Sequence, residues 1–136
     1  MKINIAKNKY YHIEIDKTKN RAYFSILAVW NGIENFSTFF EEWKQAITEL
    51  KNNFTILADL RMMPILSKEI ENLFSQTHNY FVENGLFQVA EVAALNDISN
   101  LQIDRLENKN QIPKNTFPTI EQAEEYLNQQ VKNIEN

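Results

Sequence analysis

Residues 54–67 constrain the fold most, because they join a strand of mostly apolar residues to the start of a helix through a loop that is itself apolar. Within 54–60 the only polar side chains are Thr55 and Asp59, a pattern typical of a strand buried on both faces. Ser67 is placed to cap the helix that follows. In α/β proteins, ligands and partners meet the carboxyl ends of the strands, so this loop is the first candidate for a functional surface.

Strand and helix patterns alternate along the rest of the chain. Apolar and polar residues alternate over 11–16, and the polar turn 17–20 joins this predicted strand to a more apolar one over 21–30, which predicts a hairpin. Helices are predicted over 38–51, from Ser67 to Gly85, from Asp97 and from Thr119, with strands over 54–60, 87–95 and 115–117. This order predicts a single-domain α/β fold over residues 1–136, with a mixed, mostly parallel sheet of four to five strands, an N-terminal hairpin and four helices.

The helices carry caps and apolar stripes. Ser37 or Thr38 is expected to cap the first helix, and Trp43 lies at the centre of its apolar stripe, which predicts a buried side chain. Asp97 is expected to cap the third helix. The residues of that helix expected to face the core are Ile98, Leu101 and Leu106.

Composition excludes several classes of function. The chain has no cysteine, so disulfides, zinc–thiolate sites and thiol catalysis are excluded. It has only two glycines, far apart, so loops that cradle phosphate are absent. A net charge of −4 argues against nucleic acid as a partner. No apolar run approaches the roughly 20 residues of a membrane helix, and the N-terminus is too short in apolar length for a signal peptide, so we expect a cytoplasmic protein that does not insert into membranes.

The polar residues that could carry chemistry are scattered. His12 lies on the polar face of an outer strand and His78 in the second helix, and no sequence feature supplies either with an oriented partner. Asp59 and Glu91 stand in apolar strands, where each is either a perturbed acid in a cleft or, as we favour, a strand-end acid that accepts backbone N–H groups. Arg61 could neutralise Asp59. No spacing suggests a metal site, and no cofactor or catalytic residue is predicted.

Apolar residues are unusual in a surface connection, and the loop after Arg61 consists of them. Either this loop folds over the end of the sheet and fills the core, or it forms a contact surface for a protein or the mouth of a site for an apolar ligand. The candidate residues for binding a partner or ligand are Asp59, Arg61, Met62, Met63, Ile65 and Leu66.

Three features of the chain occur in a familiar order. A hairpin over 11–30 precedes the first helix, the strand ending in Asp59 and Leu60 leads through a loop to a helix, and residues 116–127 carry a closing strand and an amphipathic helix. In this order the chain resembles STAS domains, the anti-sigma-factor-antagonist fold family, and their lipid-binding relatives. The resemblance implies that a serine at the start of the second helix is phosphorylated, and Ser67 lies about there, but the acid that precedes it in regulatory members is missing.

These observations predict a non-enzymatic regulatory or protein-interaction domain. A carrier of a small apolar ligand or lipid is the alternative, and an enzyme of unknown class that uses Asp59 or a histidine is a weaker one. An enclosed pocket of about 300 Å³ or more would favour the carrier. Both faces of the inner strands are apolar, so the face without crossover helices needs a cover, either a helix of this chain, a second copy or an unidentified partner protein.

Overall fold

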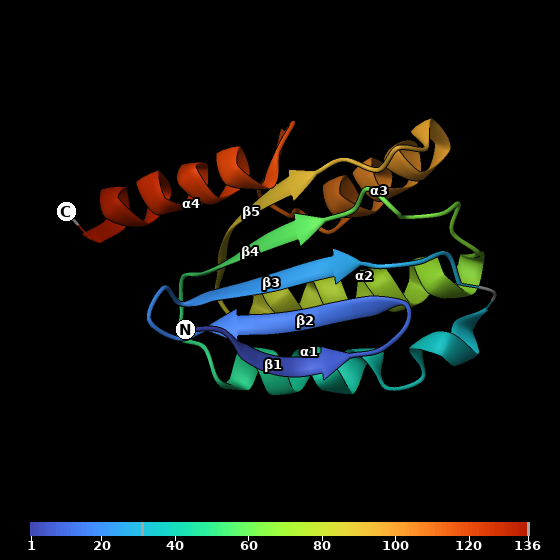
Figure 1. Cartoon of the computed structure of the whole chain (residues 1–136), viewed down its shortest axis with the longest axis horizontal. Coiled ribbons are helices and arrows are strands. Elements are labelled where there is room, and N and C mark those ends of the chain that lie inside the picture. The colour runs from blue at the N-terminus through green and yellow to red at the C-terminus, as the bar shows by residue number, and fades with distance from the viewer. Residues whose placement is uncertain (31, 136) are drawn as a thin grey trace.

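The computed structural model describes residues 1–30 and 32–135 (Figure 1), the last of them by its backbone alone. Its strands are β1 (Ile3–Lys7), β2 (Tyr11–Asp16), β3 (Arg21–Ile26), β4 (Phe54–Asp59), β5 (Leu86–Val92) and β6 (Lys114–Phe117). Its helices are α1 (Phe39–Thr48), α2 (Lys68–Glu83), α3 (Asp97–Lys109) and α4 (Ile120–Glu135), with a short 3₁₀ turn, η1 (Ile33–Phe36), before α1.

The strands lie in one sheet in the order of the sequence, β1-β2-β3-β4-β5-β6. β1, β2 and β3 pair antiparallel, and β3 to β6 pair parallel, so the sheet is mixed and mostly parallel after the hairpin, as predicted. The expectation of four to five strands is wrong, since the sheet has six. The missed strand, β1, is a short edge strand whose Ile3 is exposed, so it has no buried run for sequence patterns to reveal.

Helices α1, α2 and α3 cover one face of the sheet, because each right-handed crossover between sequential parallel strands leaves its helix on the same side. The main core lies between these helices and the sheet. Trp43 is at its centre and only 2% exposed, with its ring 4.7 Å from that of Phe81 and 5.7 Å from that of Phe24. Burial of Trp43 is thereby confirmed.

Helix α4 crosses to the other face, where it packs on β4 and β5. A small second core joins Ala123 and Leu127 of α4 to apolar side chains of the sheet. The same face of β2 carries His12 and Glu14, whose polar side chains stay in contact with water. Helix α4 therefore covers Tyr23, Leu57 and Ala90 on this face, so burial of these side chains does not require a second copy.

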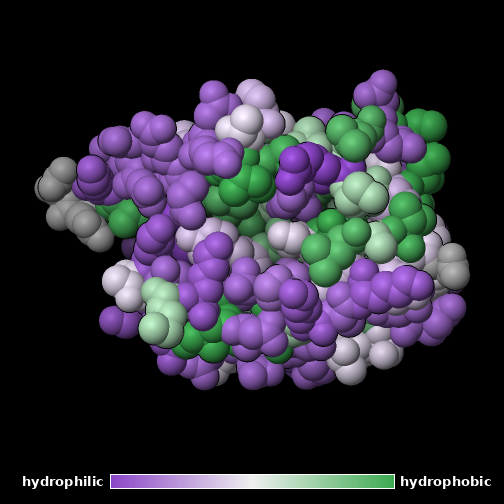
Figure 2. Space-filling model, viewed as in Figure 1, coloured by the Kyte–Doolittle hydropathy of each residue, from purple (hydrophilic) through white to green (hydrophobic). Residues whose placement is uncertain are grey.

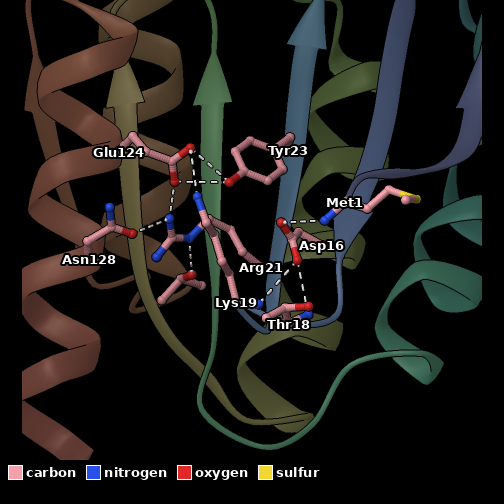
Figure 3. A network of polar contacts seen from close by, with 9 residues as sticks. Met1, Asp16, Thr18, Lys19, Arg21, Tyr23, Glu124 and Asn128 are labelled. Carbon is pink, nitrogen blue, oxygen red and sulfur yellow. Dashed lines mark hydrogen bonds and ion pairs between the residues drawn. The ribbon is translucent and has the colours of Figure 1, made fainter.

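A polar network fastens α4 to the sheet (Figure 3). The buried guanidinium of Arg21 donates to the Glu124 carboxylate and, at 2.9 Å, to the side-chain oxygen of Asn128 and to the Thr55 hydroxyl. The Tyr23 hydroxyl donates to Glu124 at 2.8 Å. Burial and the Glu124 carboxylate raise the pKa of Tyr23 above its ordinary value, so it stays a neutral donor.

The helix ends agree with the sequence-based predictions at some positions and differ at others. α1 begins after Thr38, as expected, but no side-chain hydrogen bond caps it, and it ends at Thr48 instead of residue 51. α3 is capped by Asn96, not by Asp97, because the Asn96 side-chain oxygen accepts from the backbone N–H groups of the second and third residues of the helix. α2 ends as predicted, with Gly85 at a φ of 95° that suits glycine.

Candidate functional site

The loop that leaves β4 divides its apolar residues between the core and the surface. Met63 and Leu66 are buried in the main core, whereas Met62 and Ile65 are exposed. The loop therefore fills the end of the core with two of its side chains, as the first interpretation predicts, and exposes two others, whose role in binding stays a prediction.

Hydrogen bonds hold this loop against the connection between β5 and α3. The backbone N–H of Leu95 donates to the Arg61 carbonyl oxygen at 3.1 Å. The Gln102 side chain accepts from the Leu66 N–H at 2.7 Å and donates to the Leu66 carbonyl oxygen at 2.9 Å. These paired bonds fix the end of the loop on α3.

The connection between β5 and α3 is fixed in the same way. The Asn100 side chain accepts from the Ala94 N–H at 2.9 Å and donates to the Ala94 carbonyl oxygen at 2.7 Å. Together with the Asn96 cap, these bonds order the chain from the end of β5 into the first turns of α3.

Five large apolar side chains are exposed on these ordered segments, and we call them the apolar loop patch. They are Met62 at 45%, Ile65 at 53%, Leu95 at 78%, Ile98 at 53% and Leu101 at 68% exposed. The hydrogen bonds above join their neighbours in the chain, and Figure 2 shows hydrophobic side chains gathering on the right of the molecule, over the connections that leave β4 and β5.

Three members of the patch were missed by sequence reasoning. Ile98 and Leu101 were expected to face the core, and this prediction is wrong, although Leu106 is buried as expected. The buried positions of α3 are Ser99, Ile103, Leu106 and Glu107. Because polar residues occupy two of these four positions, the apolar periodicity indicated the wrong face. The sequence did offer one signal for Leu95: this residue directly precedes Asn96, which caps α3.

Asp59 and Arg61 form a closed pair beside the patch. The Arg61 side chain donates to both Asp59 carboxylate oxygens, at 2.9 and 2.7 Å, and its backbone N–H adds a third bond at 3.2 Å. Burial tends to raise the pKa of Asp59, but the Arg61 hydrogen bonds outweigh it and hold that pKa below its usual range. Asp59 is therefore an ionised, partnered strand-end acid in this fold.

Ser67 caps α2 as predicted. Its Oγ accepts from the Ile70 backbone N–H at 3.2 Å, and its backbone has the extended conformation typical of a helix cap. The residue is exposed and directly follows the loop of the patch.

The two histidines lie on opposite faces of the sheet. His12 contacts the Asn4 side chain at 2.9 Å on the polar face of the sheet. His78 lines a cavity of about 60 Å³ inside the main core, as does Glu91. Apart from His78, all side chains lining this cavity belong to buried residues.

Within the described part of the chain, no group of three or more histidine, cysteine or carboxylate side chains is arranged to hold a metal ion. None of the described helices has the length and apolar character required to cross a bilayer.

Comparison with known proteins gives a distant structural likeness. No protein-family model matches the chain, and no curated protein does. Among solved structures, SiaC of Pseudomonas aeruginosa is similar over 86% of this chain and 99% of its own, with a TM-score of 0.49 and 9% sequence identity. A structure of apo-SiaC from the same organism is similar over 85% of this chain and 98% of its own, with a TM-score of 0.48 and 11% identity. A likeness of this degree carries no argument about function.

Proposed function

We propose that this chain is a non-enzymatic regulatory domain that acts by binding a partner protein on the apolar loop patch. One observation carries the proposal: five large apolar side chains from two hydrogen-bonded loops and the start of α3 are exposed at the carboxyl edge of the sheet. Single exposed apolar residues are normal on protein surfaces, but a group of them usually marks a contact site.

The order of the patch also supports binding. Its backbone is tied by the Leu95–Arg61 bond, by the Gln102 bonds to Leu66 and by the Asn96 cap. A surface that is already ordered loses little conformational entropy when a partner binds, so more of the apolar contact appears as affinity.

The carrier and enzyme alternatives find less support. The internal cavity of about 60 Å³ is far smaller than the roughly 300–1,000 Å³ of typical ligand sites. A groove beside Phe117 and Tyr126 is open to solvent and does not enclose a ligand. Polar groups do converge near His78, but the cavity that they face, of about 60 Å³, is far smaller than a typical substrate site.

A different protein is the favoured partner over a second copy of this chain. A second copy was one of three covers that the sequence left open for the second face of the sheet, and α4 supplies the cover over Tyr23, Leu57 and Ala90. The residues of the patch do not belong to the second core, so burying that core does not require a dimer through the patch.

The resemblance to STAS domains is compatible with this function. The resemblance implies strands in sequential order with the crossover helices on one face of the sheet. The strand order β1 to β6 and the placement of α1 to α3 agree with this arrangement. Ser67 stays a candidate phosphorylation site within the proposal, because it is exposed and joins the patch loop to the positive N-terminus of α2.

Charge substitution in the patch tests the proposal. Tagged wild-type protein, Leu101→Glu and the control Val82→Glu are each used for affinity capture from cells of the natural source. Val82 is likewise an exposed apolar residue, 41% exposed, but lies at the opposite end of α2 from the patch loop. We expect a partner that wild type and Val82→Glu retain and Leu101→Glu loses, followed by binding of the purified partner with the same ranking of variants.

Equal retention by all three proteins would contradict the patch as the contact site. Sedimentation of the purified wild type at micromolar concentration tests whether the partner is a second copy of this chain. A dimer that Leu101→Glu dissolves would identify it as one.

A further inference from the structure

Two acids and one lysine meet in the main core, next to the cavity. Glu91 of β5 is 4% exposed and Glu107 of α3 is 2% exposed. The Lys114 ammonium of β6 lies 2.9 Å from a Glu107 oxygen and 3.6 Å from a Glu91 oxygen. Lys114 also contacts the exposed carboxylate of Asp104, so its charge is shared among three acids.

The charges do not balance if both buried acids are ionised. One shared ammonium does not compensate two adjacent carboxylates away from water, so the charges favour a state in which one of the two acids keeps a proton. Burial and the hydrogen bond with Glu107 raise the pKa of Glu91 well above its ordinary value, and Lys114 opposes this rise only in part.

His78 of α2 faces the same cavity. Its Nδ1 is shielded from solvent and has no hydrogen-bond partner among the described residues, and its ring packs 6.4 Å from that of Phe81. Burial lowers the pKa of His78 to about 4, although the Glu107 charge opposes this. His78 is therefore neutral in the folded protein at neutral pH.

The charged groups that face this site come from each element packed around it: His78 from α2, Glu91 from β5, Glu107 and Asp104 from α3, and Lys114 from β6. Arg105 and Glu71 pair with each other nearer the surface, 2.9 Å apart. Of these groups, the acid pair and the Nδ1 of His78 are the ones shielded from solvent.

We propose that the Glu91–Glu107 pair is a buried proton-binding site, and that folding in mildly acidic solution moves one proton from His78 to this pair with no net uptake. In the unfolded chain at such pH, the histidine carries the proton and both acids are ionised. In the folded chain the histidine is neutral and the acid pair holds one proton, so protons and charge balance.

The proposal has a consequence for stability against pH, because the two groups act in opposite directions. An acid whose folded pKa lies above its ordinary value of 4.5 stabilises the fold at low pH and loses this effect as the pH rises through the folded pKa. A histidine whose pKa falls from 6.5 to about 4 stabilises the fold above 6.5 and loses this effect as the pH falls toward 4. In wild type these two dependences of stability on pH cancel over the pH range in which both groups act.

A single substitution at the acid pair or at His78 removes one of these two dependences of stability on pH, and the other can then be measured. Denaturant unfolding of wild type, Glu91→Gln and His78→Phe is compared between about pH 5 and pH 6.5, with His12→Gln as the control for the histidine outside the core. Relative to wild type, the folding equilibrium constant of Glu91→Gln should decrease on the order of tenfold as the pH falls across this range. That of His78→Phe should decrease as the pH rises, and His12→Gln should follow wild type.

Two results would overturn the proposal: a Glu91→Gln profile parallel to that of wild type, or a folded-state titration of His78 near its ordinary pKa. The second is measured on wild type itself by NMR of the imidazole protons, so it stands even if a core variant does not fold. The chain has two histidines, and the spectrum of His12→Gln identifies which signals belong to His78.

Discussion

The Ser67 hydroxyl is the single side-chain cap of α2, since its Oγ accepts from the Ile70 N–H at 3.2 Å. Ser67→Ala removes this acceptor and leaves an amide of the first turn without its partner. We expect a loss of about 0.5–2 kcal/mol in the free energy of unfolding, measured by denaturant melts. Ser67→Asp is the matched control, because it keeps an acceptor at the cap and adds a negative charge at the helix N-terminus. An alanine variant as stable as wild type would contradict the capping role.

Glu124 tests the polar network between α4 and the sheet. Its carboxylate is the charged partner of Arg21, which is 1% exposed, so Glu124→Ala leaves a buried cation with only neutral acceptors. We expect a loss of about 1.5–3 kcal/mol in the free energy of unfolding and faster amide hydrogen exchange along α4. The neighbouring exposed residue supplies the control, Glu125→Ala, which should behave like wild type. Equal effects from the two substitutions would show that the network does not hold α4.

At the scale of elements, Trp43 is the largest of the buried side chains of α1, and it packs between Phe24 of β3 and Phe81 of α2. Trp43→Ala should lower the free energy of unfolding by about 3–5 kcal/mol, as for other large aromatic residues of a core. In a Trp30→Phe background, fluorescence from Trp43 should resist quenching by iodide in the folded protein. Ready quenching would place the helix in a different rotational phase.

The comparison between α1 and α3 shows what sequence periodicity can and cannot reveal. In α1 the apolar residues are the buried ones, so the phase of the helix follows from the sequence. In α3, Ser99 and Glu107 occupy buried positions while Ile98 and Leu101 are exposed, because the outer face of the helix belongs to a surface patch and the inner face to a polar cluster. Periodicity assigns apolar residues to the core and cannot recognise this inversion.

The same limit explains why the candidate site was found only in part. Met62 and Ile65 were recognised because apolar residues stood in a loop, a signal local in sequence. Leu95 and Leu101 join them only through the hydrogen bonds that bring the two loops together, from Leu95 to Arg61 and from Gln102 to Leu66. The alternation of strands and helices predicted the parallel pairing of β3 to β6. The sequential order of the strands follows only from the resemblance to STAS domains, because alternation by itself is compatible with other strand orders.

At the scale of the whole molecule, the patch predicts that some apolar residues contribute little to stability. Leu101→Glu changes an exposed side chain to another good helix former, so its free energy of unfolding should stay within about 0.5 kcal/mol of that of wild type. Thermal or denaturant unfolding measures this directly. If Leu101 instead faced the core, a loss of about 2–5 kcal/mol would be expected, and such a loss would contradict the placement of α3.

Site-specific photocrosslinking in cells of the natural source tests most directly whether the patch binds a partner protein. A photoreactive amino acid is placed at Leu101, and in a separate protein at Val82 as the control; both side chains are exposed. We expect the protein labelled at Leu101 to crosslink to a specific partner that the protein labelled at Val82 does not reach. Identical products from the two positions, or no product except a dimer of this chain, would contradict the claim.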